Sequence, residues 1–288
     1  MTRRQASAVV LAAVLVLAAC KTSKAATPDP SLPTTTTTLK PTTTLFPTAD
    51  AAFGTRVEGV LTVATSGDEP PFLVRTPGQA TGLEAEVVRV IASRLHINEV
   101  RWVVRSRVTL VGTQDCECDL YIGRVRASTD LARLVDLSQP YVSADQAVLQ
   151  RATDAPVTTT TAPFIRWATT VDDASAGDVI HDDVKPSNPA LRMGDRPAVL
   201  DALRTGKADA ALLDGPFALA AAAADKSLVV TSRFATHDGW VIVLPIGSPG
   251  TPSLNDVLED MRADGTLAFL ARRWLGRDPG ALPVVPAR

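Results

Sequence analysis

From residue 57 onward, short β-branched apolar runs alternate with segments whose apolar residues recur at helical spacing. Residues 60–64 suit a buried strand, and the apolar stripe over residues 83–95 predicts an amphipathic helix. Further strands are expected at 101–104, 120–122 and 208–213, and further helices near 197–206, over 217–224 and over 266–274. Ser253 and Asp256 resemble a capping box at another helix start. Strands that alternate with helices imply parallel sheets flanked by helices, so the predicted fold class is α/β.

The N-terminus has the pattern of a secretory signal peptide. Two arginines precede an apolar run over residues 8–19, and small residues lead to Cys20. The run of about 12 residues is shorter than the roughly 20 that span a bilayer. Its end, Leu-Ala-Ala-Cys, resembles the bacterial lipobox, in which the cysteine becomes the mature N-terminus and carries a lipid. We expect residues 1–20 to be a signal peptide and Cys20 to anchor a secreted protein on the extracytoplasmic face of the cell membrane. A plain signal peptide is the alternative.

A Thr- and Pro-rich segment follows the expected anchor. Residues 21–54 contain few large apolar side chains, so they cannot bury enough surface to offset their ordering entropy. We expect a disordered tether, with an O-glycosylated stalk as the alternative. At the other end, residues 277–288 are expected to be a C-terminal tail.

Composition and cysteine content limit the possible functions. The hydrophobic fraction of 45% is ordinary for a packed protein, and the formal charge of −2 gives no sign of a nucleic-acid partner. Besides Cys20 there are only Cys116 and Cys118, for which a local disulfide, a metal pair and two buried thiols all stay open. The run 181–183 has metal-ligand residue types without a partner at a diagnostic spacing, which favours a solvated loop. No metal and no cofactor is expected.

Five blocks carry a family resemblance. They are LTVATSGDEPPF (61–72), TGLEAEVVRVIASRL (81–95), VDLSQPY (135–141), TGKADAALLD (205–214) and MRADGTLAFLARRWLG (261–276). In this order they resemble the amino-acid-type (family 3) extracellular solute-binding proteins of bacterial ABC importers. The resemblance implies a two-lobed, type II periplasmic-binding-protein-like fold with a ligand cleft between the lobes. It places lobe 1 at 55–147 plus 242–276 and lobe 2 at 148–241, with crossings near 147–149 and 241–243.

The resemblance also implies a ligand site, from which this chain departs. Asp214, at the end of a predicted strand, matches the aspartate that takes a ligand's ammonium group, with a helix cap as the alternative. Glu69 replaces the usual aromatic residue, and Leu131 replaces the arginine that clamps the ligand's carboxylate. Arg124 and Arg126 replace two serines and, being two apart in an extended segment, project from one face. The candidate ligand-binding residues are Glu69, Phe72, Arg124, Arg126, Asp172 and Asp214.

Two interpretations of these charges compete. In the first, Arg124 and Arg126 replace the missing clamp and bind an anionic group of the ligand, since guanidinium suits carboxylate recognition. In the second, the two arginines pair with Glu69, Asp172 and Asp173, and the site no longer accepts ordinary amino acids. Some pairing is expected in either case, because a buried charge without a partner is costly.

Three functions follow from the pattern. The leading one is a monomeric, membrane-anchored binding protein that captures a small polar or charged solute, an amino acid or derivative, and delivers it to an ABC permease. The alternative is a sensor or structural descendant of the same fold that acts through a partner protein. An enzyme is least favoured, since no acid–base pair or nucleophile motif is evident.

Overall fold

The computed structural model describes residues 53–106 and 116–286. The chain divides into two units, residues 1–45 and 46–288, and every described residue belongs to the second. The expected signal peptide, Cys20 and residues 21–52 of the expected tether lie outside the described residues. Within the described ranges, no helix has the length and apolar character needed to span a membrane.

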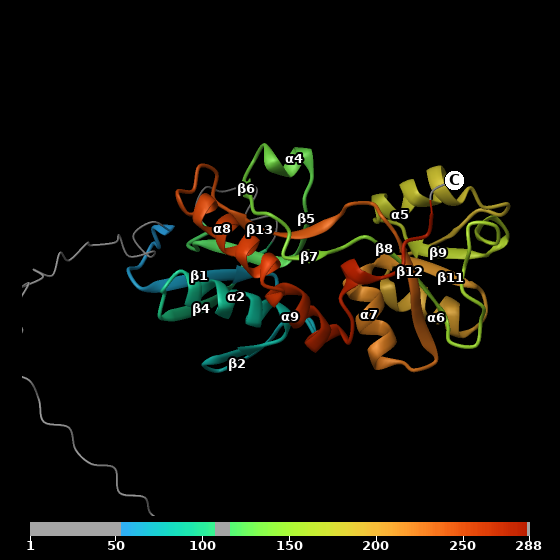
Figure 1. Cartoon of the computed structure of the whole chain (residues 1–288), viewed down its shortest axis with the longest axis horizontal. Coiled ribbons are helices and arrows are strands. Elements are labelled where there is room, and N and C mark those ends of the chain that lie inside the picture. The colour runs from blue at the N-terminus through green and yellow to red at the C-terminus, as the bar shows by residue number, and fades with distance from the viewer. Residues whose placement is uncertain (1–52, 107–115, 287–288) are drawn as a thin grey trace, which may run out of the picture. The chain divides into compact units, whose positions relative to one another are not determined.

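One β-sheet, with the helices that pack on it, forms what we call the first lobe. Its strand order is β4-β1-β5-β13-β6, and β7 also pairs with β13. The bounds are β1 Val60–Thr65, β4 Glu99–Val104, β5 Leu120–Arg126, β6 Asp136–Leu137, β7 Val142–Ser143 and β13 Gly239–Leu244. β1 runs parallel to β4 and β5, whereas β13 is antiparallel to β5. Helices α2 (Leu83–Arg94), α8 (Gly250–Ala263) and α9 (Thr266–Leu275) pack against one another in this lobe (Figure 1). A hairpin of β2 (Val74–Thr76) and β3 (Gln79–Thr81) and the short α4 (Thr129–Ala132) complete it.

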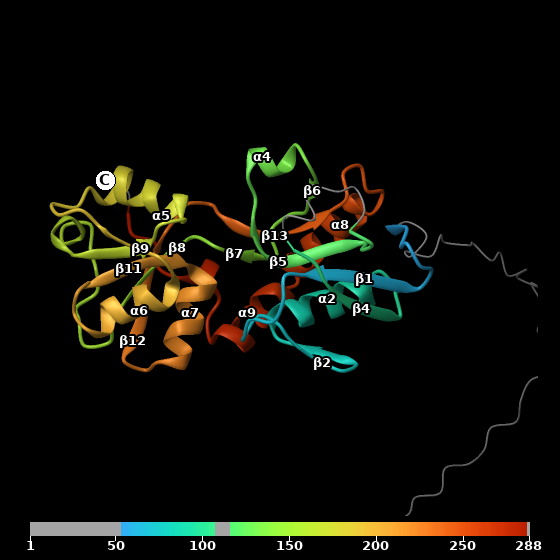
Figure 2. The same ribbon diagram turned by 180° about the vertical axis from the view of Figure 1, so that it is seen from behind.

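A second β-sheet forms the second lobe. Its strand order is β10-β9-β11-β8-β12. The strand bounds are β8 Gln146–Arg151, β9 Trp167–Thr170, β10 Leu191–Met193, β11 Ala210–Asp214 and β12 Leu228–Phe234. Helices α6 (Arg196–Arg204) and α7 (Gly215–Ala224) lie on one face of the sheet and α5 (Ala174–Asp178) on the other, as Figures 1 and 2 show from opposite sides. Short helical turns η1 Ala162–Phe164, η2 Val179–Val184 and η3 Pro279–Ala281 connect these elements. The α/β fold class is confirmed.

The chain passes between the two sheets twice. The first passage follows β7 and ends where β8 begins at Gln146, and the second joins the end of β12 at Phe234 to Gly239 of β13. The sequence placed these crossings near 147–149 and 241–243. Those segments are instead parts of β8 and β13, and each of these strands pairs within one sheet. The passages therefore precede those segments by a few residues. The segment after α9 also leads from the first lobe to the second, where it pairs with β12. Lobes joined by short connections of this kind can move against each other.

Most expected helices agree with the structure, but the start of α8 does not. The prediction of a capping box at Ser253 is wrong, because α8 begins at Gly250 with Pro249 as its N-cap. Gly250 packs so closely on Phe53 that an added Cβ would lie 2.8 Å from the ring. The first turn of α8 therefore packs on Phe53 and lies three residues before the capping signal.

Both ends of the described chain are packed. Phe53, at the end of the expected tether, is buried in the core with 2% of its surface exposed. Beyond α9, the expected tail folds back over the second lobe. The backbone of Arg233 donates to Pro283 and accepts from Val285, at 2.8 Å in each case. Val285 is buried in the core of that lobe.

The two cysteines of the body form the local disulfide, one of the three alternatives left open by the sequence. Cys116 and Cys118 are joined directly across Glu117. Both cysteines are buried, and they pack in a cluster with Tyr121 of β5.

The start of α2 generates a prediction about stability. Gly82, the N-cap, has φ of +114°, and an added Cβ would lie 2.3 Å from the carbonyl oxygen of Phe72. We expect Gly82→Ala to lower the free energy of unfolding by more than about 2 kcal/mol, through backbone strain and this clash. Gly194→Ala is the control, since its Cβ would meet nothing within 4 Å; its effect should stay within about 0.5 kcal/mol. Urea unfolding of both variants checks this, and equal effects would contradict it.

Candidate functional site

A cavity of about 490 Å³ is lined by residues of both lobes. The first lobe contributes the segment after β1 and the end of β5, while the second contributes the segments after β9 and β11 and the start of α6. Its described lining is Ser66, Glu69, Arg124, Arg126, Thr170, Asp172, Asp173, Gly194, Asp195, Arg196, Leu213, Asp214 and Phe217. β1 runs parallel to β4 and β5, and β9 runs parallel to β11. β1, β9 and β11 all end here, and open α/β sheets bind ligands outside the carboxyl ends of their strands.

Arg126 reaches from the first lobe to carboxylates beyond it. Its guanidinium bonds both carboxylate oxygens of Asp173, at 2.9 and 3.3 Å, and forms an ion pair with Asp214. Asp238, on the second passage between the sheets, lies 3.9 Å from the same group. One guanidinium therefore faces three carboxylates.

Asp214 is held as a cleft residue rather than as a helix cap. Its side chain makes no capping bond to α7. Instead, its carboxylate accepts from Trp240 Nε1 at 3.0 Å and from Gln146 Nε2 at 3.3 Å. The neighbouring Asp173 has both roles: its carboxylate caps α5 by accepting from Ala176 N, and it also accepts from Arg126 in the cleft. Asp214 therefore stands at the N-cap position of α7 without capping the helix through its side chain.

Arg124 belongs to a second, more deeply buried group of charges. It bonds Glu84 of α2 through its side chain and its backbone N–H, both at 2.9 Å, and pairs with Glu69 at 3.1 Å. The hydroxyl of Tyr141 donates to Glu84 at 2.7 Å. Burial raises the pKa of Glu84 above its ordinary value, although Arg124 and Tyr141 stabilise the carboxylate and oppose the shift. Burial and the adjacent carboxylate hold the pKa of Tyr141 well above its ordinary value.

Arg196 is a cleft residue that the sequence analysis missed. It is the first residue of α6 and bonds Glu69 of the other lobe at 2.5 Å. Its guanidinium lies 3.5 Å from the centre of the Phe217 ring, a cation–π contact. Burial lowers the pKa of Arg196, while the attraction of Glu69 opposes that shift. The sequence did contain a signal for Arg196, which is the first residue of the helix after β10. A side chain at that position faces the end of the sheet, where ligands bind.

The other expected residues lie in different surroundings. Asp172 is exposed at the rim of the cavity, and Leu131 packs in a first-lobe cluster outside it. Phe72 is buried and packs edge-on against Phe217 and Trp240, each with ring centroids 5.2 Å apart, so it supports the floor. His181 and Asp182 are exposed and bond each other. Among the described residues, no group of three or more ligand-type side chains could hold a metal ion.

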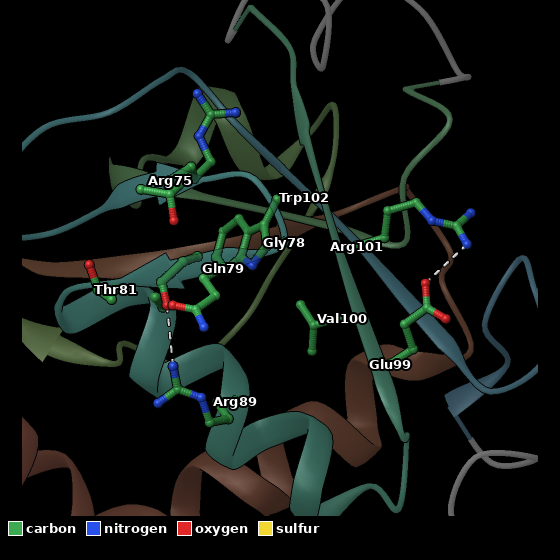
Figure 3. Close-up of a pocket in the computed structure, with 12 residues that line it drawn as sticks. Arg75, Gly78, Gln79, Thr81, Arg89, Glu99, Val100, Arg101 and Trp102 are labelled. Atoms are coloured by element: carbon green, nitrogen blue, oxygen red, sulfur yellow. Dashed lines mark hydrogen bonds and ion pairs between the residues drawn. The ribbon is translucent and has the colours of Figure 1, made fainter.

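A separate cavity of about 730 Å³ lies at the edge of the first sheet, between β4 and the β2–β3 hairpin (Figure 3). Its arginines have local partners. Arg101 pairs with Glu99 at 3.1 Å, and Arg89 donates to the carbonyl of Ala80 at 3.2 Å. Arg75 pairs with Asp68 at 2.7 Å. This cavity contains none of the predicted site residues.

The two sheets and the cavity that both lobes line define a two-lobed, type II periplasmic binding protein. The chain belongs to the bacterial extracellular solute-binding proteins, family 3, whose model matches residues 61–277. Among its relatives is the L-cystine-binding protein TcyJ of Escherichia coli K12, 25% identical, with 76% of this chain and 84% of the relative aligned. The expected family and fold are confirmed.

Solved structures share the fold. The L-cystine solute receptor of Neisseria gonorrhoeae, in its unliganded open conformation, has a TM-score of 0.64 at 19% identity, covering 76% of this chain and 93% of its own. An ancestral cationic amino acid solute-binding protein has a TM-score of 0.62 at 23% identity, covering 75% and 96%. An ancestral cyclohexadienyl dehydratase has a TM-score of 0.58 at 24% identity, covering 77% and 97%. At these identities the likeness establishes the fold alone.

The buried pair of Glu84 and Arg124 generates a second stability prediction. Their side chains are 0% and 7% exposed, so Glu84→Ala leaves a guanidinium buried with less compensation. We expect a loss of about 3–5 kcal/mol in the free energy of unfolding. Adding Arg124→Ala to Glu84→Ala should cost less than the sum of the single changes, since the uncompensated charge is then removed.

The matched control is Glu99→Ala, which breaks an exposed pair with Arg101 whose side chains are 59% and 50% exposed. It should change stability by at most about 1 kcal/mol. Denaturant unfolding of the variants measures all the changes. A Glu84→Ala effect no larger than that of Glu99→Ala would show that the buried pair is not needed for stability.

Proposed function

We propose that this chain is a lipid-anchored, extracytoplasmic binding protein that captures one small charged solute, an amino acid or derivative, between its lobes and delivers it to an ABC permease. One observation carries the proposal: a cavity of about 490 Å³ is lined by charged groups of both lobes, in a chain of this family. That volume lies within the roughly 300–1,000 Å³ usual for small-molecule sites. The relative TcyJ is named for binding L-cystine, which supports an amino-acid-like solute for this chain as well.

The residues proposed to form the binding site are Glu69, Arg124, Arg126, Asp172, Asp173, Arg196 and Asp214, with Phe72 supporting the floor. Arg126 and Glu69 each bond a residue of the other lobe, so a charged solute must exchange with bonds that the protein makes to itself. A solute that contacts both lobes favours their closure, and a permease can recognise the closed form. In this proposal the body is monomeric, and residues 21–52 tether it to Cys20.

The alternative, a descendant of this fold that acts through a partner protein, is favoured by one observation. The ion pairs Arg126–Asp173 and Arg196–Glu69 join the lobes with the protein's own charges. A cleft closed in this way presents a fixed two-lobed surface without any solute. A role in binding rather than catalysis is common to both candidates.

Solute binding is tested by titrating the purified body, from residue 50 onward, with a panel of amino acids and derivatives in a calorimeter. We expect at least one solute to bind and to raise the melting temperature. Asp214→Asn should weaken that binding by at least about tenfold, since a charge-assisted hydrogen bond is lost. Asp130→Asn, on the exposed α4, is the matched control and should have no effect. If no solute binds, the proposal is wrong and the partner-protein alternative replaces it.

Membrane anchoring is tested by expressing the whole chain in a bacterium that lipidates such proteins. The parent chain should fractionate with membranes and incorporate an alkyne-labelled fatty acid, whereas Cys20→Ala should do neither. The double variant Cys116→Ala/Cys118→Ala is the control, because it removes the other two cysteines and should keep the label. A label that persists in Cys20→Ala would contradict the anchor.

A further inference from the structure

Acidic groups outnumber basic groups around the cleft. Among the described residues that line it are three arginines, whereas the carboxylates are Glu69, Asp172, Asp173, Asp195 and Asp214. The buried Glu84 lies behind them, bonded to Arg124. An empty cleft with this excess attracts a compound of net positive charge.

The three carboxylates that face Arg126 are each positioned by other groups. Asp173 accepts from Ala176 N and from Gln146 Nε2, at 3.1 and 3.2 Å. Asp214 accepts from the same Gln146 amide and from Trp240. Asp238 accepts from Ser175 at 2.5 Å and from Thr236 at 2.8 Å. The carboxylates therefore have bonds that hold them in place independently of Arg126.

Gln146 lies behind the carboxylates of Asp173 and Asp214 and orients both of them. Its side-chain amide is fully buried, and Nε2 donates to both Asp173 and Asp214. These bonds fix the orientation of the amide, because the opposite orientation would point its oxygen at two carboxylates. Oε1 is then buried beside them without a hydrogen-bond partner among the described residues. Gln146 therefore holds Asp173 and Asp214 side by side, a pair of carboxylates that suits an ammonium or guanidinium.

Arg126 differs from Arg124 in how it is held. Arg124 is 7% exposed and bonded to Glu84 and Glu69 of its own lobe. Arg126 is 24% exposed, and its guanidinium pairs with Asp173 and Asp214 of the second lobe and with Asp238 of the passage. Because β5 carries Arg126 with the first lobe, separation of the lobes withdraws its guanidinium and leaves these carboxylates facing solvent.

We propose that the cleft takes a net-cationic solute, and that Arg126 occupies the place of its cationic group when the cleft is empty. The proposal rests on the proposed function and narrows its solute class. The ammonium or guanidinium of the solute displaces Arg126 and is bonded by Asp173 and Asp214, which Gln146 holds in place. Arg126 is thus an internal competitor of the solute. The opposite interpretation, in which Arg126 clamps an anionic group, makes it a necessary ligand contact.

The test compares L-arginine with L-citrulline, a neutral compound of nearly the same shape, and with L-glutamate, by calorimetric titration. We expect L-arginine to bind at least about tenfold more tightly than either, because charge-assisted hydrogen bonds are the stronger ones. Arg126→Ala should raise the affinity for L-arginine by at least about threefold, since a competitor is removed. Asp173→Asn should lower it by at least about tenfold. Arg126→Gln, which keeps most of the side-chain volume, is the second variant should Arg126→Ala not fold.

Specific outcomes overturn the inference. If removing Arg126 weakens the binding of L-arginine or leaves it unchanged, Arg126 is not a competitor. If L-citrulline or L-glutamate binds as tightly as L-arginine, the solute class is wrong, yet the proposed function stands because a solute is bound. If none of the three compounds nor any other solute of the panel binds, both the inference and the proposed function fail.

Discussion

A charged side chain withdrawn from water must have an opposite charge beside it, and the arrangement of this protein's cleft depends on that requirement. Arg124 is almost fully buried and has Glu84 and Glu69 as partners, with Tyr141 completing the hydrogen bonds of Glu84. Desolvation of such groups costs several kcal/mol each, and a paired opposite charge with hydrogen bonds offsets this cost. The floor of the first lobe is therefore fixed by a local charge network. It holds Glu69 at 3.1 Å from Arg124, in position to reach Arg196 across the cleft.

The same requirement acts differently on the two arginines of β5. Arg124 finds its partners within its own lobe, whereas Arg126 finds them on the other side of the cavity. The first pair survives any movement of the lobes, while the second must be exchanged for other bonds when they separate. Arg124 and Arg126 are two positions apart in the same strand. Arg124 supports the structure of its lobe, whereas Arg126 links the conformation of the protein to the contents of its cleft.

Much of the fold was predictable because its signals are local. Apolar spacing predicted α2 within one residue at its end, and Gly276 correctly marked the end of α9. The start of α8 was not predictable in this way, since its first residue, Gly250, packs on Phe53, a tertiary contact that local spacing does not reveal. The passages between sheets were also misplaced by a few residues. They depend on which strands pair, and the sequence pattern of a single strand does not carry that information.

The candidate site was predictable only where a residue stands at a recognisable position in a motif. Asp214 was found because it ends a predicted strand inside one block of the pattern, and Arg124 and Arg126 because they stand where the family has two serines. Arg196 and Gln146 were not, because each contributes through a partner distant in sequence: Glu69 in one case, and Asp173 with Asp214 in the other.

The bonds across the cleft also determine how the measured affinity for a solute must be interpreted. A solute that enters does not add its ionic bonds to an empty site; it replaces bonds that the protein already makes, so the affinity reports a difference between two sets of pairs. A cation that takes the place of Arg126 restores bonds to Asp173 and Asp214 but returns one guanidinium to water, where it is well solvated. An anion bound by Arg126 would instead leave two carboxylates beside each other with less compensation. The arrangement of partners, more than the number of charges, therefore favours the cation.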